Sequence, residues 1–117
     1  MMYLIRLRLF ETTEEEREGF MIVKTILRQK TKAGRIAFRD AQSYFAVLLD
    51  DNNRKTVCRL YLNGSKRYIG TFDDQKKETK NEILTVDDIF KYAELLQKTV
   101  TNYDGEKVDK NIVSTEV

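Results

Sequence analysis

The chain has 117 residues, a formal net charge of +2 and a hydrophobic content of 41%. This length suits one domain with a single core, and no apolar run approaches the ~18 residues that would suggest a membrane-spanning helix. The absence of histidine and the single cysteine exclude Ser-His and Cys-His nucleophile pairs, cysteine-rich zinc modules and an internal disulfide. We therefore predict a globular cytoplasmic protein, with no membrane partner, that keeps Cys58 reduced in its core.

The first predicted element is a helix from Glu14 to about Gln29. Residues 1–11 precede it, and we interpret them as either an extra strand or a remnant of upstream sequence. Thr13 followed by Glu16 is a capping-box pattern, which predicts that the helix begins at this point. Apolar residues recur at helical spacing and predict a buried stripe. The stripe contains Phe20, Val23 and Leu27.

Four short apolar runs, separated by turn residues, lie between residues 35 and 72. Successive side chains of a strand point to opposite faces of the sheet. The predicted core face contains Ile36, Phe38, Phe45, Val47, Leu49, Cys58, Leu60 and Leu62. The opposite face contains Arg35, Arg39, Tyr44, Arg59, Tyr61 and Arg67. Asn63-Gly64 is a strong hairpin signal, so we expect a mainly antiparallel sheet.

The sequence pattern after residue 72 predicts a loop and then a second helix. No apolar residue occurs from Asp73 to Glu82, which indicates a solvated loop. Thr85 is expected to cap the helix, whose stripe is Ile89, Ala93, Leu96 and Val100. Periodicity is lost after Asn102, and we interpret residues 104–117 as a frayed tail. The predicted fold is a single α+β domain of two layers, in which two helices cover one face of a four-stranded sheet in the order α-β-β-β-β-α.

Charge is unevenly distributed along the chain. The segment from Lys24 to Arg67 contains eleven basic and three acidic residues, a net charge of +8, which leaves −6 for the remainder. Guanidinium groups bind phosphate oxygens and tyrosine rings stack on unpaired bases. Our first hypothesis is therefore a nucleic-acid-binding surface, the alternative being a solvated face whose arginines pair with nearby aspartates. The candidate residues are Arg35, Arg39, Arg54, Lys55, Arg59, Tyr61, Lys66 and Arg67.

One tripeptide suggests an enzyme. Glu78-Thr79-Lys80 matches the Glu-x-Lys pattern of metal-dependent nucleases, in which carboxylates hold Mg²⁺ and the lysine orients water. Such a tripeptide needs a rigid apolar strand, and this one lies in the most polar run of the chain. Asp50 to Lys55 begins like a calcium loop, but a lysine stands where glycine is required. We therefore predict no catalytic residue, metal site or cofactor here, and keep a small metal nuclease as a third hypothesis.

Several segments together resemble a known family. They are Thr12–Glu16, Gly19–Arg28, Arg39–Lys55, Cys58–Leu60, Tyr68–Gly70 and Asp87–Tyr92. Over residues 12–103 the chain resembles the C-terminal domain of bacterial type I restriction enzyme R proteins. The resemblance implies an accessory DNA-binding domain of a restriction-modification system, with DNA and the nuclease domain or other subunits as partners. The Mg²⁺-dependent endonuclease site would belong to a preceding domain, so we expect this chain to be a fragment or a free-standing copy.

A second hypothesis is a structural or docking domain of the same system. Apolar residues gathered on one sheet face would favour self-association into a homodimer or docking onto the nuclease. The predicted interface contains Tyr44, Ala46, Leu48, Val57 and Ile69.

Overall fold

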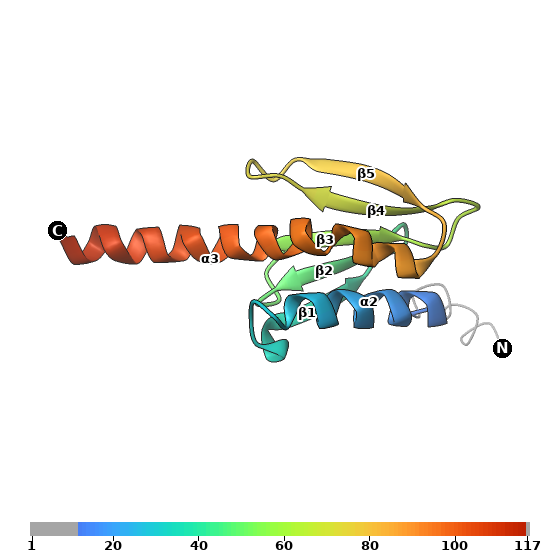
Figure 1. Cartoon of the computed structure of the whole chain (residues 1–117), viewed down its shortest axis with the longest axis horizontal. Helices are drawn as coiled ribbons and strands as arrows, with labels where there is room; N and C mark the ends of the chain where they lie inside the picture. The colour runs from blue at the N-terminus through green and yellow to red at the C-terminus, as the bar shows by residue number, and fades with distance from the viewer. Residues whose placement is uncertain (1–11, 117) are drawn as a thin grey trace.

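The computed structural model describes the backbone of residues 12–116 and the side chains of residues 12–105. Its elements are the helix α2 (Glu14–Leu27), the short 3-10 helix η1 (Ala33–Arg35), the strands β1 (Ile36–Asp40), β2 (Phe45–Leu49), β3 (Thr56–Tyr61), β4 (Arg67–Phe72) and β5 (Glu78–Ile83), the 3-10 helix η2 (Val86–Tyr92) and the helix α3 (Ala93–Glu116) (Figure 1). The predicted α+β class is confirmed. The prediction for residues 1–11 lies outside the described residues.

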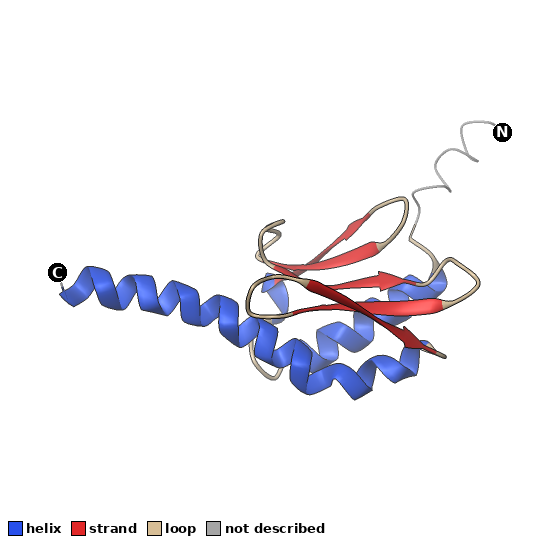
Figure 2. Ribbon diagram, turned by 90° about the horizontal axis from the view of Figure 1, so that it is seen from above, coloured by secondary structure: helices blue, strands red, loops and turns tan. Residues whose placement is uncertain are grey.

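The five described strands form one antiparallel sheet in the order β1-β2-β3-β4-β5. Helices α2 and α3 lie together on one side of this sheet, as the view in Figure 2 shows. On its other side, the described part of the chain places no helix. The sheet therefore has a helix-covered face and an open face, and we use these two names below.

The N-terminus of α2 is fastened to the sheet by a buried carboxylate. Thr13 and Glu16 form the predicted capping box, in which Glu16 Oε1 accepts a hydrogen bond from the Thr13 backbone N–H at 2.9 Å. Glu16 Oε2 also accepts one from Asn63 Nδ2, in the turn between β3 and β4, at 3.2 Å. One turn further along the helix, a Cβ on Gly19 would lie 2.8 Å from Leu60 Cδ1. The missing side chain therefore lets α2 approach β3 closely.

The predicted core face is confirmed. Seven of its eight residues are buried against the helices, and the predicted stripe of the second helix supplies further buried residues. The exception is Phe38, which is 46% exposed because it lies on the edge strand β1. Its ring still stacks on Phe45, with ring centroids 4.9 Å apart. The buried residues predicted for this face are Ile36, Phe45, Val47, Leu49, Cys58, Leu60 and Leu62.

A fifth strand replaces the predicted loop. β5 pairs along β4 from Glu78, opposite Phe72, to Ile83, opposite Arg67. The strand is an edge, and its charged side chains protect an exposed edge from pairing with other chains. An edge strand with one solvated side does not need apolar residues at alternate positions. The predicted strand count of four is therefore wrong, and the predicted loop from Asp73 to Glu82 is wrong from Glu78 onward.

The second helix begins at its predicted cap, Thr85, but ends differently from the prediction. It starts as the 3-10 helix η2, where the Asp88 carboxylate accepts hydrogen bonds from the backbone N–H groups of Leu84 and Thr85. It continues as α3 to Glu116 and runs past the end of the sheet, whereas the sequence predicts a frayed tail from residue 104 (Figure 1). None of the helices in the described residues is long and apolar enough to span a membrane.

Candidate nucleic-acid interface

A row of cross-strand neighbours crosses the open face from β1 to β5. Each strand contributes one residue, and each residue pairs with the next one across the ladder. In order from β1 to β5, these residues are Arg39, Ala46, Arg59, Gly70 and Lys80. Residues that face each other across a ladder project from the same side of the sheet. Three cations therefore share one line, with an alanine and a glycine between them. We call this line the basic row.

Arg59 lies at the centre of the basic row. Its Nη1 donates a hydrogen bond to Glu78 Oε1 at 3.1 Å. Its guanidinium carbon lies 4.7 Å from the centre of the Tyr44 ring and 5.4 Å from that of Phe72. Its Nε is buried and finds no hydrogen-bond partner among the described residues. Buried polar groups are usually paired. The unpaired Nε therefore shows that Arg59 uses only part of its hydrogen-bonding capacity.

Glu78 holds this part of the open face together. Its Oε2 accepts a hydrogen bond from the Tyr61 hydroxyl at 2.6 Å. The carboxylate lies over Gly70, where an added Cβ would come within 2.9 Å of the carboxyl carbon. Only glycine leaves room for this approach. Burial, together with the Glu78 carboxylate, raises the pKa of Tyr61 to about 12, so the phenol remains a donor at neutral pH. Lys80 Nζ lies 4.0 Å from the centre of the Tyr61 ring.

Two cavities share Arg59 as a lining residue. The first has a volume of about 360 Å³, with the Tyr44 ring in its wall. The second has a volume of about 220 Å³ and lies at the end of the sheet, where it is lined by Arg54, Lys76 and Tyr103 of α3. Because both cavities are also lined by Asn53 and Thr56, we treat them as one open-face groove. Its charged lining residues are Arg39, Asp40, Arg54, Arg59 and Lys76.

The cations of the groove differ in how far they are neutralised. Arg39 contacts Asn53 and pairs with Asp51 at 2.9 Å, while its side chain stays 47% exposed. Arg54 and Lys76 form no ion pair with any described residue. Lys76 Nζ lies 5.6 Å from the Tyr103 ring, and the left-handed backbone of Lys76 (φ 65°) turns the chain before β5. The groove is therefore a basic depression with unpaired charge at one end.

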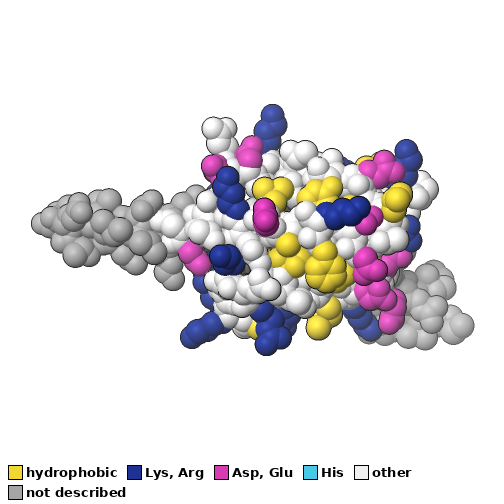
Figure 3. Space-filling view, in the orientation of Figure 1, with side chains coloured by type: hydrophobic (Ala, Val, Ile, Leu, Met, Phe, Trp, Pro, Cys, Tyr) yellow, Lys and Arg dark blue, Asp and Glu magenta, His cyan; other side chains and the backbone are white. Residues whose placement is uncertain are grey.

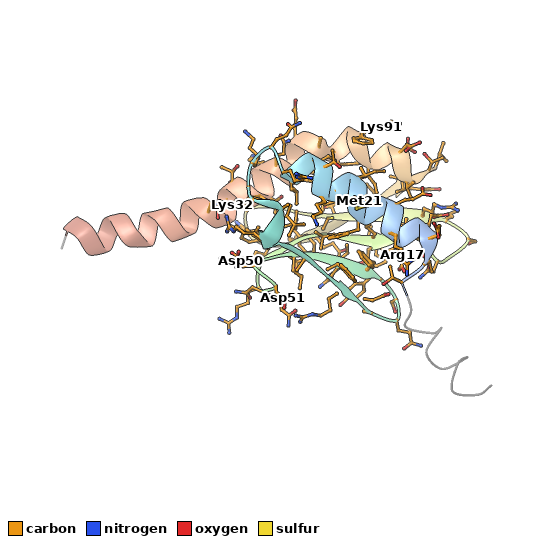
Figure 4. The ribbon with its side chains drawn as sticks, turned by 90° about the horizontal axis from the view of Figure 1, so that it is seen from below. Arg17, Met21, Lys32, Asp50, Asp51 and Lys91 are labelled. Atoms are coloured by element: carbon orange, nitrogen blue, oxygen red, sulfur yellow. The ribbon has the colours of Figure 1, made fainter. Side chains whose placement is uncertain are left out.

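Arg35, which was predicted on the open face, lies at the end of the sheet, beside Lys55 of the loop between β2 and β3. Arg35 donates to Asp50 and to Asp104 of α3, each at 2.8 Å. Hydrogen bonds from Arg35 lower the pKa of Asp50 to about 2. Lys55 Nζ also lies 3.4 Å from the Asp50 carboxylate. Figure 4 labels Asp50 and Asp51 at the end of the sheet from which α3 projects. Arg35 and Lys55 therefore stabilise this corner of the fold.

The predicted placement of Arg67 on the open face is wrong. Arg67 lies opposite Ile83, which is buried against the helices, and its Nη2 pairs with Glu15 of α2 at 2.7 Å. The error arises because β4 carries bulky side chains at both alternating positions. Lys66 is exposed in the preceding turn and forms no ion pair within the described chain. The structure thus brings Arg39, Arg54, Arg59 and Tyr61 together, and leaves the other predicted site residues elsewhere.

The apolar patch predicted for self-association is not exposed. Four of its five residues, Ala46, Leu48, Val57 and Ile69, are each at most 6% exposed, and the fifth, Tyr44, is half-buried. Val57 is the extra residue where the pairing of β2 with β3 shifts register, and Ile69 faces the helices. This predicted interface is therefore wrong. The large hydrophobic residues that are exposed in the described structure are Met21, Phe38, Leu84, Phe90 and Leu95.

The tripeptide Glu78-Thr79-Lys80, considered above for a metal nuclease, forms hydrogen bonds within the sheet. Glu78 and Lys80 do lie on one face of a rigid strand, but both carboxylate oxygens of Glu78 accept hydrogen bonds from Arg59 and Tyr61. Within the described residues, no group of three His, Cys, Asp or Glu side chains is placed to hold a metal ion. Glu78 therefore positions Arg59 and Tyr61 in the described structure.

Sequence reasoning left four residues out of this site. Gly70 and Glu78 form the close approach that orders Arg59, Lys80 completes the basic row, and Lys76 lines the smaller cavity. Glu78 and Lys80 were considered only for a metal nuclease. A glycine inside a strand often marks a close approach by another group, so Gly70 carried a readable signal. Lys76 carried none, since its position depends on the turn between β4 and β5.

The chain was also compared with known proteins. No protein-family model, curated protein or solved structure matches it. The resemblance to the restriction enzyme R domain therefore stays a prediction.

Proposed function

We propose that the open face binds DNA, and that the chain acts as an accessory DNA-binding domain of a type I restriction endonuclease R protein, without an active site of its own. The observation that carries the DNA-binding part is the basic row of Arg39, Arg59 and Lys80 beside a groove that adds Arg54 and Lys76. Phosphate contacts from lysine and arginine supply most of the sequence-independent affinity of proteins for DNA. The restriction-system part rests on the resemblance alone.

The dimensions of the basic row suit a nucleic-acid backbone. Neighbouring strands lie about 4.8 Å apart, so three cations on alternate strands of a five-stranded sheet span about 20 Å. One strand of B-DNA advances about 3.4 Å per nucleotide, so the row is as long as about six nucleotides. A bound backbone could contact all three cations at once.

A salt titration tests this proposal. We expect a fluorescently labelled 20-nucleotide DNA to bind at low salt, with an affinity that falls linearly on a log–log plot as salt increases. The double variant Arg54→Ala/Lys76→Ala should bind more weakly and reduce the slope by about 2, because each lost phosphate contact removes about 1. Neither side chain forms an ion pair in the described structure, so folding should be unaffected.

A matched control is the double variant Arg17→Ala/Lys91→Ala. It removes the same charge from exposed positions on the helix layer, where Figure 4 labels both residues. It should bind DNA as the unchanged protein does. If the protein shows no DNA affinity even at low salt, or if both double variants lose affinity equally, the open face is not the binding surface.

Self-association or docking onto a restriction subunit is a second candidate, now with a different surface. Met21, Leu84 and Phe90 are each more than half exposed. Figure 3 views the helix-covered side and shows hydrophobic side chains lying between charged ones. Light scattering over a range of protein concentrations tests homodimer formation. A strict monomer at the highest concentration would exclude it.

A further inference from the structure

We infer that the open-face groove holds a single strand, with one unpaired base in the larger cavity and an adjoining phosphate in the smaller one. The inference rests on the proposed function and names the form of nucleic acid that this site takes. The two cavities have different linings, and Arg59 lines both.

The larger cavity has the lining that a nucleobase requires. Ala46 and Leu48 supply apolar lining, and the half-buried Tyr44 contributes an aromatic ring. The guanidinium groups of Arg39 and Arg59 supply hydrogen-bond donors for the polar edge of a base. Its volume of about 360 Å³ falls within the usual range for small-molecule sites. A bare phosphate would gain nothing from the apolar part of this lining.

The smaller cavity has the lining that a phosphate requires. It is lined by Arg54, Arg59 and Lys76, with no carboxylate among its described lining residues. Two of these cations have no ion-pair partner in the described structure, so an anion here would not compete with an internal carboxylate for them. Because Arg59 lines both cavities, one guanidinium can contact a base and its own phosphate together.

The need for an unpaired base excludes an intact duplex from this mode of binding. A base inside a duplex is stacked and paired, and it must be flipped out before it can enter a cavity. A single strand offers its bases without this penalty, and proteins recognise such strands by stacking aromatic side chains on them. The Tyr61 ring lies 5.9 Å from that of Tyr44, so the aromatic surface continues beyond the cavity.

A binding comparison tests the inference. A labelled ten-nucleotide oligo(dT) is measured at low salt against a duplex of the same length, and thymidine monophosphate is added as a competitor. We expect the single strand to bind at least tenfold more tightly than the duplex, and the mononucleotide to compete only weakly, because it engages fewer of the cations. Equal or tighter binding of the duplex would overturn the inference and leave the proposed function standing.

Two tyrosine variants locate the base. Tyr44→Leu keeps an apolar side chain but removes the ring, and it should weaken single-strand binding about tenfold while leaving duplex binding unchanged. Tyr68→Leu is the matched control, because Tyr68 is opposite Tyr61 on the open face but lines neither cavity. A strand carrying 2-aminopurine should change its fluorescence on binding to the unchanged protein and to Tyr68→Leu, but not on binding to Tyr44→Leu.

The remaining outcomes are also decisive. Equal losses in Tyr44→Leu and Tyr68→Leu would show that the cavity does not hold the base. A mononucleotide that competes as well as an unlabelled strand would show a nucleotide site instead of a strand site. No binding of either DNA form would overturn both this inference and the proposed function.

Discussion

The two faces of the sheet are built by neighbouring residues of the same strands, yet different forces hold them. On the helix-covered face, residues such as Leu60 and Ile69 are completely buried, and each buried apolar side chain contributes about 1.5–3 kcal/mol. On the open face, Arg59, Tyr61 and Glu78 are joined by partly buried polar contacts that solvent still reaches, and ion pairs screened by solvent contribute roughly 0–1 kcal/mol. The comparison indicates that one face supplies the stability, which leaves the side chains of the other able to exchange partners with a ligand.

Truncating one side chain on each face should give the largest difference in the free energy of unfolding. Leu60→Ala should lower the free energy of unfolding by about 2–5 kcal/mol, because it leaves a cavity under α2. Lys80→Ala, on the open face, should change it by less than about 0.5 kcal/mol. Urea unfolding followed by circular dichroism measures both. Similar values for the two variants would show that stability is not concentrated on one face.

Asp50 tests the corner where the sheet meets α3. Its pKa of about 2 lies below the ordinary value of 3.8, so its ion pair with Arg35 stabilises the fold above pH 4 and loses this effect as the pH falls towards 2. We expect a loss of roughly 1 kcal/mol over this range, reduced by solvent screening because the pair is partly exposed. Unfolding measured at pH 5 and pH 2.5 should show the loss in the unchanged protein and a smaller one in Asp50→Asn. The same acid loss in both proteins would contradict the assignment.

The ionisation of Tyr61 at high pH tests the contacts of the open face. Its pKa in the folded protein is raised to about 12 from an ordinary 10, so its stabilising effect is complete below pH 10 and lost as the pH rises to 12. A spectrophotometric titration should show a late tyrosine ionisation that disappears in Tyr61→Phe. A late ionisation that persists in this variant belongs to another tyrosine.

The smallest expected effect concerns the binding of DNA. Glu78→Gln keeps an acceptor for the Tyr61 hydroxyl but removes the negative charge beside Arg59. DNA affinity should therefore rise a few-fold, with little change in stability. Glu82→Gln is the control, since Glu82 is exposed on the same strand and forms no ion pair among the described residues. An equal rise in the control would indicate a general charge effect without release of Arg59.

The helix-covered face could be predicted because β2 and β3 alternate clearly. Phe45, Val47, Cys58 and Leu60 occupy alternate positions, and the structure buries them all. The same rule placed Arg39 and Arg59 together on the open face. The rule failed for β4. Tyr68 and Phe72 occupy one set of alternate positions and Ile69 the other, so either set could face the helices. Only the tertiary contact between Gly70 and Glu78 identifies the open side of that strand.

The polar edge of the sheet could not be predicted from hydrophobic patterns. β5 is held by its ladder with β4, and only Ile83 among its residues is buried. Its strand propensity is weak, and pairing with a formed neighbour decides its structure. The groove shares this dependence, because Lys76 reaches it from the turn that β5 creates. A site assembled from an edge strand and its turn has little local signature in the sequence.

The burial of Cys58 provides an internal probe of the whole fold. It is the only cysteine of the chain, it is completely buried in β3, and burial raises the pKa of its thiol. A thiol reagent can therefore reach it only when the sheet and helices separate. The rate of its modification would report how often the native molecule opens, and a bound ligand that stabilises the fold would slow that rate without any added label.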